Sequence, residues 1–317
     1  SCSANFEKTL EILLDFVQHP YFTPENVEKE RGIITQEITM YLDSPAWRVC
    51  MELYRGMFAN NPVRNDIAGS AESIALITDK LLYDVYAFYE PSNMYLCIAG
   101  GFDMESAIEV CERCLLPGKT MNTASILPEE PERVIMPRVQ MSMPLGKTNF
   151  ALGFKSPAYS GRQMTEEYIY QTLMNDATVG AATDFYRSMR DSGLINETFE
   201  SSIMMGRGFF VPAIFGESDD PDRAAQMICE EYRRRKSDPP TKEAFLRAKK
   251  YLYGDNVRTF NNVESVAQNL SDAALTGTSA FDYAELAAAA DYEGMLQRIE
   301  NFDEGNCCLS VITPSED

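Results

Sequence analysis

An internal repeat is the feature that most constrains how this chain can fold. The segment Asn93–Ile98 resembles Asn306–Val311, which lies 213 residues later, and positions before each segment match in the same order. At a slightly larger shift of 218 residues, Glu37 matches Asp255. Any single match is weak, but a consistent order over about 100 residues favours a duplication. We therefore expect two related domains, which also suits a chain of 317 residues that is long for one core.

The repeat predicts a particular division of the chain. Residues 1–116 form the C-terminal half of a first repeat, residues 117–145 a linker, and residues 146–317 a second repeat. The linker is predicted from five prolines and a glycine between positions 117 and 144. Expected strands and helices between 149 and 216 have no counterpart before Ser1. We therefore expect the first repeat to lack its N-terminal half.

Apolar spacing and capping residues predict a mixture of helices and short strands. Thr23 is an expected helix cap, with Pro24 at the first helical position. In the first half, helices are expected at 6–17, 24–41, 45–58, 78–89 and 103–116, and an apolar strand at 94–99. In the second half, strands are expected at 149–154, 195–205, 209–216 and 308–312, with helices up to 190 and from about 221 to 299.

The charge and cysteine patterns exclude several classes of function. A net charge of −20 argues against binding nucleic acid or an anionic membrane. The one basic run, Arg233–Lys236, follows an acidic helical stretch and is typical of cations at a helix C-terminus. No apolar run approaches the ~20 residues that cross a bilayer. Eight irregularly spaced cysteines in a long chain do not resemble a disulfide scaffold, so the cytoplasm is the expected location.

Glu30 and Glu37 are the carboxylates that the sequence singles out. They are seven residues apart, which is close to two helical turns, so they share one face of the expected helix. That face borders an apolar stripe that includes Val27, Ile34 and Ile38. From spacing alone, solvated residues at the flank of a helix are favoured over paired or metal-bound carboxylates.

Several motifs resemble one family of peptidases. They are Glu25-Asn-Val-Glu-Lys-Glu-Arg-Gly-Ile-Ile-Thr-Gln-Glu-Ile38, Asp43-Ser-Pro45, Asp66-Ile-Ala-Gly-Ser-Ala-Glu-Ser-Ile74 and Phe88-Tyr-Glu-Pro-Ser-Asn-Met94, with weaker matches at 152–155 and 192–194. In order and spacing they resemble the insulinase/pitrilysin-type zinc metallopeptidases, in the bacterial branch similar to mitochondrial processing peptidase. The resemblance covers essentially the whole chain and is most specific between residues 20 and 100.

The resemblance implies an α+β fold: a tandem repeat of a metallopeptidase-type domain, with helices packed on a mainly antiparallel sheet and the first repeat truncated. In this family two histidines of an inverted His-x-x-Glu-His motif bind zinc, and the motif glutamate activates the bound water. A third ligand follows in a later helix, and by position it is Glu37 here. Glu30, one heptad earlier, matches an acid that supports the zinc site. The motif itself is expected roughly 40 residues before Ser1.

One histidine is too few for such a site. Catalytic zinc needs two histidines and a carboxylate, with a position left for water, whereas this chain contains only His19. His19 stands at an expected helix end, where a cationic or capping role is ordinary. We therefore expect zinc in the complete protein and none in this chain alone.

The second repeat resembles the half of the family that binds no metal. Ala248 and Asp255 stand where the first repeat has Glu30 and Glu37. In such halves an arginine and a tyrosine often bind the substrate backbone. Arg190 matches the arginine, but no tyrosine follows it closely. A homologous partner subunit is therefore the other expected source of these groups.

Two functions remain open at this stage. The chain is first interpreted as a fragment of a zinc-dependent endopeptidase that acts on peptides or unfolded segments. Alone it is expected to be inactive, because both histidine ligands and the general base are missing; the missing half-repeat and the absent initiator methionine favour this interpretation. The alternative is a non-catalytic peptide-binding or partner subunit of a peptidase-like dimer. Either function is compatible with a homo- or heterodimer with a homologous subunit, and neither involves nucleic acid or a membrane.

A bare Ca²⁺ or Mg²⁺ site at Glu30 and Glu37 is a weaker third interpretation, because no loop has a recognisable coordination spacing.

Overall fold

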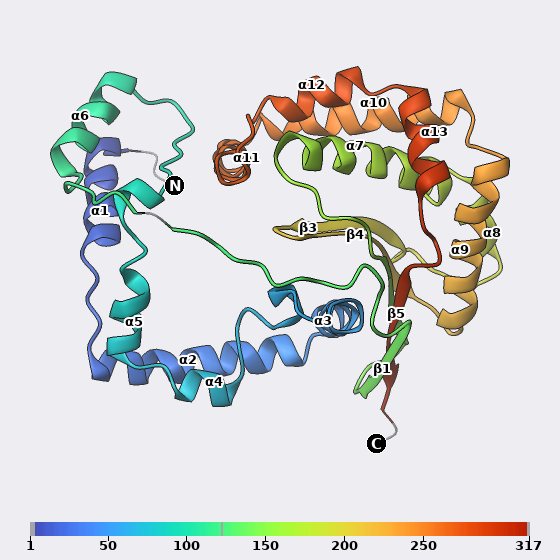
Figure 1. Cartoon of the computed structure of the whole chain (residues 1–317), viewed down its shortest axis with the longest axis horizontal. Helices are drawn as coiled ribbons and strands as arrows, with labels where there is room; N and C mark the ends of the chain where they lie inside the picture. Colours follow the sequence, from blue (N-terminus) through green and yellow to red (C-terminus); the bar gives the residue numbers. More distant parts are fainter. Residues whose placement is uncertain (1–3, 122, 316–317) are drawn as a thin grey trace. The chain divides into compact units, whose positions relative to one another are not determined.

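The computed structural model describes residues 4–121 and 123–315, and the chain divides into two compact units (Figure 1). Unit 1 comprises residues 1–38, 68–126 and 258–280, and unit 2 comprises residues 39–67, 127–257 and 281–317. The units therefore interleave along the chain instead of following one another. The predicted repeats, with their boundary at 117–145, are defined by sequence similarity, whereas the units are defined by contacts within the fold. The units therefore do not test the repeat boundary, which stays a prediction.

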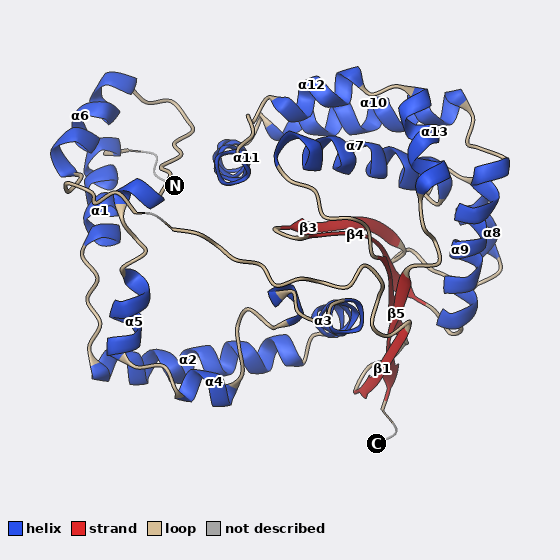
Figure 2. Ribbon diagram, viewed as in Figure 1, coloured by secondary structure: helices blue, strands red, loops and turns tan. Residues whose placement is uncertain are grey.

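Unit 2 contains a five-stranded sheet. The strands are β1 (Arg138–Met143), β2 (Asn149–Phe154), β3 (Glu200–Gly206), β4 (Phe209–Glu217) and β5 (Cys307–Pro314). Their order in the sheet is β1-β5-β2-β4-β3. The pair β1–β5 is parallel, and the pairs β5–β2, β2–β4 and β4–β3 are antiparallel (Figure 2). The helices are α3 (Pro45–Met57), η1 (Pro62–Arg64), α7 (Gly161–Thr178), α8 (Asp184–Asp191), α9 (Pro221–Ser237), α10 (Lys242–Thr259), α12 (Asp282–Ala289) and α13 (Tyr292–Asn301). The expected α+β fold, with helices on a mainly antiparallel sheet, is confirmed.

Helices cover both faces of this sheet, so its central strands are apolar on both sides. Along β2, Phe150 and Leu152 point into a core shared with α7, α9 and α13. Ala151, between them, points to a second core on the opposite face, which β2 and β5 form with α3. This alternation is the period of two of a strand. Burial on both faces explains why residues 150–154 form a run without polar side chains.

Two glycines allow α3 to lie close to the sheet. A Cβ atom on Gly56 of α3 would come within 2.5 Å of the Cys308 sulfur. A Cβ atom on Gly153 of β2 would come within 2.9 Å of the Leu53 side chain. Real carbon contacts are longer than this, so larger residues at either position would push the helix and the sheet apart.

Strand β1 lies inside the segment that the prolines predict as a linker. Pro137 and Pro144 flank it, and these two breakers mask the strand in the sequence pattern. It occupies one edge of the sheet and pairs in parallel along β5. Proline beside an edge strand is tolerated because one side of that strand has no neighbour to accept its hydrogen bonds.

A buried ion pair anchors the stretch before β1. The ammonium of Lys155, just after β2, lies 2.9 Å from a Glu130 carboxylate oxygen and 2.8 Å from the Met57 carbonyl oxygen. The two charged side chains are 5% and 13% exposed. Glu130 also accepts hydrogen bonds from the backbone N–H groups of residues 59–61. Burial raises the pKa of Glu130, but Lys155 and these N–H groups outweigh it and lower that pKa to about 2.

This ion pair predicts a specific sensitivity to acid. The pKa of Glu130 is lower in the folded chain than the ordinary value of about 4.3. Its contribution to stability is therefore present above that value and is lost as the pH falls through about 2. We expect the free energy of unfolding to drop by about 1–2 kcal/mol across this window, since solvent screens part of the interaction. Urea unfolding curves, followed by the fluorescence of Trp47, would measure the drop. Glu130→Gln should show a smaller drop, and an equal one would contradict this assignment.

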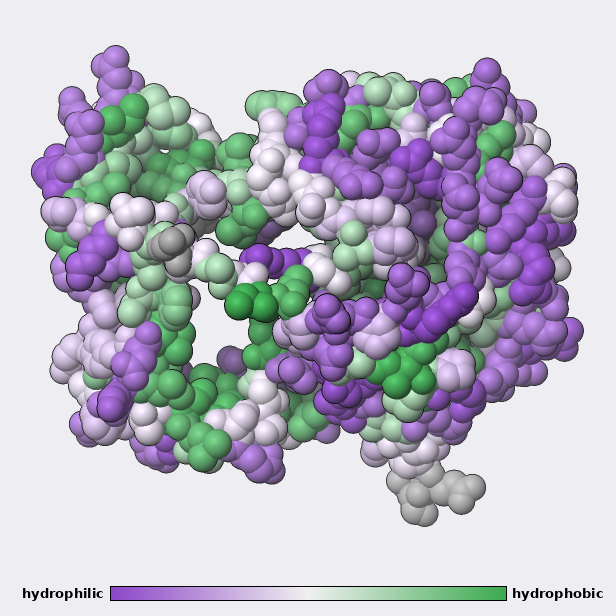
Figure 3. All heavy atoms as spheres, in the orientation of Figure 1, coloured by the Kyte–Doolittle hydropathy of each residue, from purple (hydrophilic) through white to green (hydrophobic). Residues whose placement is uncertain are grey.

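Unit 1 has a much smaller core. Its described elements are α1 (Phe6–Gln18), α2 (Pro24–Leu42, continuing into unit 2), α4 (Ala71–Ala75), α5 (Asp79–Tyr86), η2 (Pro91–Asn93), α6 (Met104–Cys114) and α11 (Val263–Thr276). Leu10 and Leu14 of α1 pack against Ala107 and Val110 of α6. Elsewhere large apolar side chains remain exposed, for example along α5, where Figure 3 shows hydrophobic residues at the surface.

Residues 94–99, which the sequence predicts as a strand, have no partner strand in the described part of the chain. Tyr95 and Leu96 are 67% and 43% exposed. The segment that it resembles in sequence, Asn306–Val311, lies almost entirely in β5, between β1 and β2. A strand depends on hydrogen bonds to neighbouring strands. Similar sequences therefore form a strand in β5 and an irregular segment at 94–99.

The basic run Arg233–Lys236 lies at the end of α9, where its side chains pair with Glu231, Asp238 and Glu304. These pairs compensate its charge, which leaves little attraction for a polyanion. Among the helices that the structure describes, none is long and apolar enough to cross a membrane.

Candidate functional site

Helix α2 carries the two carboxylates that the sequence singles out. It starts as predicted: the Thr23 hydroxyl accepts the Asn26 N–H at 3.2 Å, and Pro24 is the first helical residue. The helix continues unbroken past both carboxylates. At 1.5 Å per residue, Glu30 and Glu37 lie about 10 Å apart along its axis.

Both carboxylates are exposed and available. Within residues 4–121 and 123–315, neither Glu30 nor Glu37 forms a hydrogen bond or an ion pair. Val27 and Ile38 on the same helix are buried, so both carboxylates border the apolar side of α2 as the spacing predicts. A free carboxylate on a regular helix can bind a metal ion without first breaking an ion pair.

Glu30 also lines a cavity of about 700 Å³ in unit 1. The lining is mainly apolar and includes Val27, Ile34 and Tyr86, and His19 is part of it. Glu37 is not among the lining residues. One carboxylate and one imidazole beside apolar walls are too few groups for acid–base catalysis at a metal.

His19 occupies the C-terminal end of α1 and contacts Asp15 of the same helix. Its ring Nδ1 lies 3.0 Å from the Asp15 carboxylate and 3.1 Å from the Asp15 carbonyl oxygen. This geometry agrees with the helix-end role expected from the sequence. Across the described residues, no group of three or more histidine, cysteine, aspartate or glutamate side chains is arranged to hold a metal ion. These residues can therefore provide one zinc ligand but not a complete set.

Arg190 lies in the last turn of α8 in unit 2. Its guanidinium is about half exposed, pairs with Asp191 at 3.4 Å and lies 6.0 Å from the centre of the Tyr186 ring. Such an exposed, weakly held guanidinium is free to turn toward solvent. A role in binding the substrate backbone stays a prediction.

Asp255 of α10, the residue that matches Glu37 in the sequence repeat, is exposed and lies near two tyrosines. Its charge acts on Tyr168 of α7 and on Tyr283 of α12, whose rings lie 5.9 Å apart. Burial is the main cause that raises the pKa of Tyr168; the Thr172 side chain lowers it, and the Asp255 charge raises it further. Asp255 therefore lies near Tyr168, which also interacts with Thr172, four residues further along α7.

Sequence reasoning missed this cluster, although a signal was present. Tyr168-x-x-Gln171-Thr172 has the spacing of His-x-x-Glu-His, with Gln171 in the place of the glutamate. A tyrosine, a threonine and a glutamine provide neither imidazole ligands nor a general base. The motif spacing is therefore present on α7 without the side chains that bind zinc in the motif.

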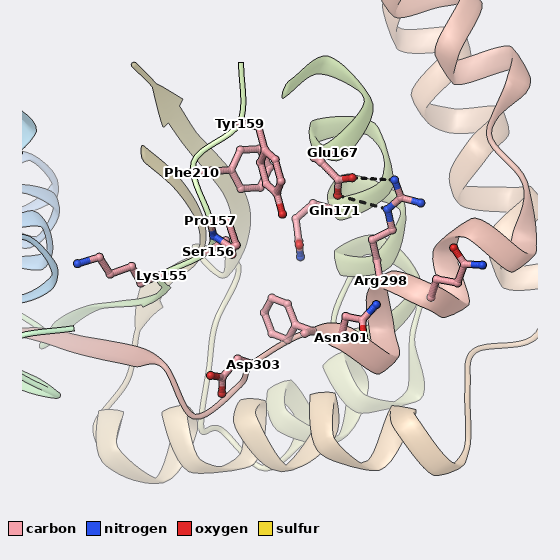
Figure 4. A pocket seen from close by; sticks show the side chains of 12 residues that line it. Lys155, Ser156, Pro157, Tyr159, Glu167, Gln171, Phe210, Arg298, Asn301 and Asp303 are labelled. Atoms are coloured by element: carbon pink, nitrogen blue, oxygen red, sulfur yellow. Dashed lines mark hydrogen bonds and ion pairs between the residues drawn. The ribbon is translucent and has the colours of Figure 1, made fainter. Parts of the chain in front are cut away.

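A second cavity, of about 350 Å³, lies in unit 2 beside Gln171 (Figure 4). Its walls come from the segment after β2 and from β4, α7 and α13. Tyr159 and Phe210 provide aromatic surface, and Glu167 and Arg298 face each other as an ion pair at 2.7 Å. Figure 4 shows the Gln171 side chain among these groups. This is the more polar of the two cavities.

Comparison with known proteins identifies the family. The family model described as "Insulinase (Peptidase family M16)" matches residues 1–71, and the one described as "Peptidase M16 inactive domain" matches residues 77–252. With the α+β fold and the carboxylate helix, these matches define a metallopeptidase-type protein. The chain belongs to the M16 peptidase family.

Relatives are similar over nearly the whole chain. The uncharacterized zinc protease YmfH of Bacillus subtilis is 35% identical over 320 residues, which cover 98% of this chain and 74% of YmfH. A protein named probable mitochondrial-processing peptidase subunit beta, from Arabidopsis thaliana, is 22% identical over 99% of this chain and 62% of its own length. The crystal structure of an M16-like peptidase from Alicyclobacillus acidocaldarius is 32% identical with a TM-score of 0.91, over 98% of this chain and 76% of that chain. The predicted family is confirmed, including its similarity to mitochondrial processing peptidase.

Proposed function

We propose that this chain supplies the carboxylate part of a zinc centre in an M16 endopeptidase that cleaves peptides or unfolded segments. Glu37 is the proposed zinc ligand, and Glu30 is the acid that supports it. The observation that carries the proposal is the exposure of the Glu37 carboxylate. It is an exposed carboxylate without a partner among the described residues, on a helix within the insulinase match. The 35% identity to a protein named as a zinc protease agrees with this assignment.

The proposed duplication gives a second, independent argument for Glu37 as the zinc ligand. Asp255, the match of Glu37, acts on Tyr168 beside Thr172. Positions 168 and 172 have the spacing of two zinc-binding histidines. In the first repeat, an equivalent helix with His-x-x-Glu-His would bring two histidines to Glu37 in the same way. The second-repeat cluster thus serves as a template for the proposed zinc site.

The proposed site needs histidines from outside these 317 residues, because the chain contains only His19. YmfH is longer than the region it shares with this chain, which covers 74% of it. The proposed active form is therefore a longer form of this chain or a complex with a homologous subunit. The 317 residues alone are proposed to be inactive and to bind no zinc.

Zinc content and peptide cleavage test this proposal. The chain is expressed alone and together with the coding sequence upstream of Ser1, and both proteins are assayed on an unfolded peptide. We expect the extended protein to bind about one zinc ion and to cleave the peptide in a chelator-sensitive way. The chain alone should do neither. An extended protein that carries His-x-x-Glu-His but binds no zinc would overturn the proposal.

A non-catalytic partner subunit is the second candidate. The match of residues 77–252 to a domain described as inactive favours it. In that case the chain would bind peptide and form a dimer with a homologous subunit that carries the histidines. The same expression experiment separates the two candidates. An upstream sequence without the histidine motif, together with copurification of a zinc-binding homologue, would support the partner subunit.

Three finer expectations remain proposals. Arg190 is proposed to bind a substrate carbonyl, supported by its exposed and weakly paired guanidinium. The two repeats are proposed to meet at 117–145, supported by the order of the sequence matches. The cytoplasm is the proposed compartment, supported by the irregular spacing of the cysteines.

A further inference from the structure

The polar cavity of unit 2 contains a buried group whose hydrogen-bonding capacity is only partly used. Gln171 is 7% exposed, and its amide N–H donates to the Asn175 side-chain oxygen at 2.8 Å. The Gln171 carbonyl oxygen accepts no hydrogen bond from the described residues. Figure 4 shows this amide pointing into the cavity. The oxygen is accessible from the cavity, so an occupant that donates a hydrogen bond can take the place of solvent there.

The ion pair beside Gln171 leaves an excess of negative charge. Arg298 lies 2.7 Å from a Glu167 oxygen and 3.1 Å from a Glu166 oxygen. Its guanidinium also lies 4.0 Å from the centre of the Tyr170 ring, which fixes its position. One cation therefore faces two carboxylates. Arg298 takes two of the roughly four acceptor positions of Glu167, so this carboxylate can accept further donors.

The other charged residues of the cavity are compensated elsewhere. In Figure 4 Lys155 points away from the cavity, and its ammonium pairs with Glu130. Asp303 pairs with Arg133 at 2.9 Å. The surplus carboxylate is Glu166, which lies beside the lining residues, is 42% exposed and adds negative charge next to the cavity. An anionic ligand is disfavoured and a cationic one is favoured.

Aromatic side chains complete the binding surface. Tyr159 and Phe210 meet edge to face with ring centres 5.1 Å apart, and Phe302 also lines the cavity. Burial is the main cause that raises the pKa of Tyr159; the Glu167 charge raises it further and Arg298 opposes it, so the phenol is neutral. Aromatic rings attract organic cations. A volume of about 350 Å³ suits a single side chain or a small molecule.

We propose that this cavity binds the guanidinium or ammonium group of a basic side chain, with Gln171 and Glu167 as the acceptors. The cation would satisfy the free Gln171 carbonyl, compensate the surplus carboxylate and lie against the aromatic wall. The proposal involves no zinc and does not depend on the proposed peptidase function. It can therefore be tested on the 317-residue chain by itself.

A pair of matched probes tests the proposal. N-acetyl-arginine amide carries the cation, and N-acetyl-citrulline amide has nearly the same shape without the charge. In a ligand-detected NMR titration, we expect the arginine derivative to bind at least about tenfold more tightly, which corresponds to about 1.4 kcal/mol. Equal dissociation constants would overturn the proposal. So would the absence of saturable binding of the arginine derivative below about 10 mM.

Variants assign the binding to this cavity. Gln171→Leu removes the acceptor at similar volume, and Glu167→Gln removes the charge at the same shape. Each should weaken binding of the arginine derivative about tenfold and have less effect on the citrulline derivative. Glu197→Gln changes an exposed carboxylate outside the cavity and should leave both dissociation constants unchanged. Unchanged binding in Glu167→Gln, with its fold verified by thermal melting, would place the cation elsewhere.

Two further probes identify the source of the cation. Agmatine carries a guanidinium on a free amine, whereas the tripeptide Ala-Arg-Ala carries it on a peptide. Tighter binding of the tripeptide would identify a peptide side chain as the occupant. Tighter binding of agmatine would instead identify a free amine and would exclude the peptide.

Discussion

Lys155→Met is expected to lower the free energy of unfolding of unit 2 by about 3–5 kcal/mol. The variant keeps most of the apolar stem but removes the ammonium, so the buried Glu130 carboxylate loses its cation. The ammonium also lies 4.7 Å from the centre of the Phe58 ring, and that attraction is lost as well. The measurement is urea unfolding followed by Trp47, the single tryptophan, which lies on α3 in the same unit.

A matched control separates burial from charge. Arg133 and Asp303 form an ion pair at the same distance of 2.9 Å, but their side chains are 71% and 52% exposed. Arg133→Met should therefore destabilise by less than about 1 kcal/mol. Adding Glu130→Gln to Lys155→Met should recover part of the loss, because no charge is then left buried. If Lys155→Met and Arg133→Met had equal effects, the buried pair would not be an anchor.

Local signals in the sequence were sufficient for most helices. Thr23 and Pro24 define the start of α2, and Ser44 with Pro45 defines the start of α3, because caps and first-turn prolines act within a few residues. A strand, by contrast, depends on partners that are distant in the sequence. Residues 94–99 have the composition of a strand but no neighbour in the described chain, whereas β1 has prolines at both ends and pairs with β5 from the far end of the sequence.

The candidate site likewise has some features that local sequence predicts and others that depend on contacts between distant segments. The common face of Glu30 and Glu37 follows from helical geometry, so the spacing predicts it correctly. The closeness of Asp255 to Tyr168 joins residues of α10 and α7 that are about 90 positions apart in sequence, so no local pattern predicts it. The cavity beside Gln171 is also lined by Arg298 and Asn301 of α13. The sequence of α7 alone therefore does not predict it.

The two carboxylates that we propose for the zinc site, Glu37 and Glu30, can be tested in the extended protein. Glu37→Gln is expected to lower zinc affinity and zinc-dependent peptide cleavage by at least about 100-fold, because an amide oxygen is a poorer zinc ligand than a carboxylate. Glu30→Gln should lower both by only about 10-fold, since this acid is proposed to support the site without binding the metal. The measurements are zinc content after dialysis and the rate of cleavage of an unfolded peptide at saturating zinc.

Glu25→Gln is the matched control for these variants. Glu25 is an exposed carboxylate in the first turn of the same helix, so its replacement changes the net charge by the same amount. If the effect of Glu37→Gln came from charge or helix stability, Glu25→Gln would reproduce it. A zinc ligand gives a different pattern: Glu25→Gln is unchanged, Glu30→Gln is intermediate, and added zinc restores Glu30→Gln better than Glu37→Gln. Equal zinc content and activity in Glu37→Gln and Glu25→Gln would exclude Glu37 as the third ligand, while the fold and the family membership of the chain would stand.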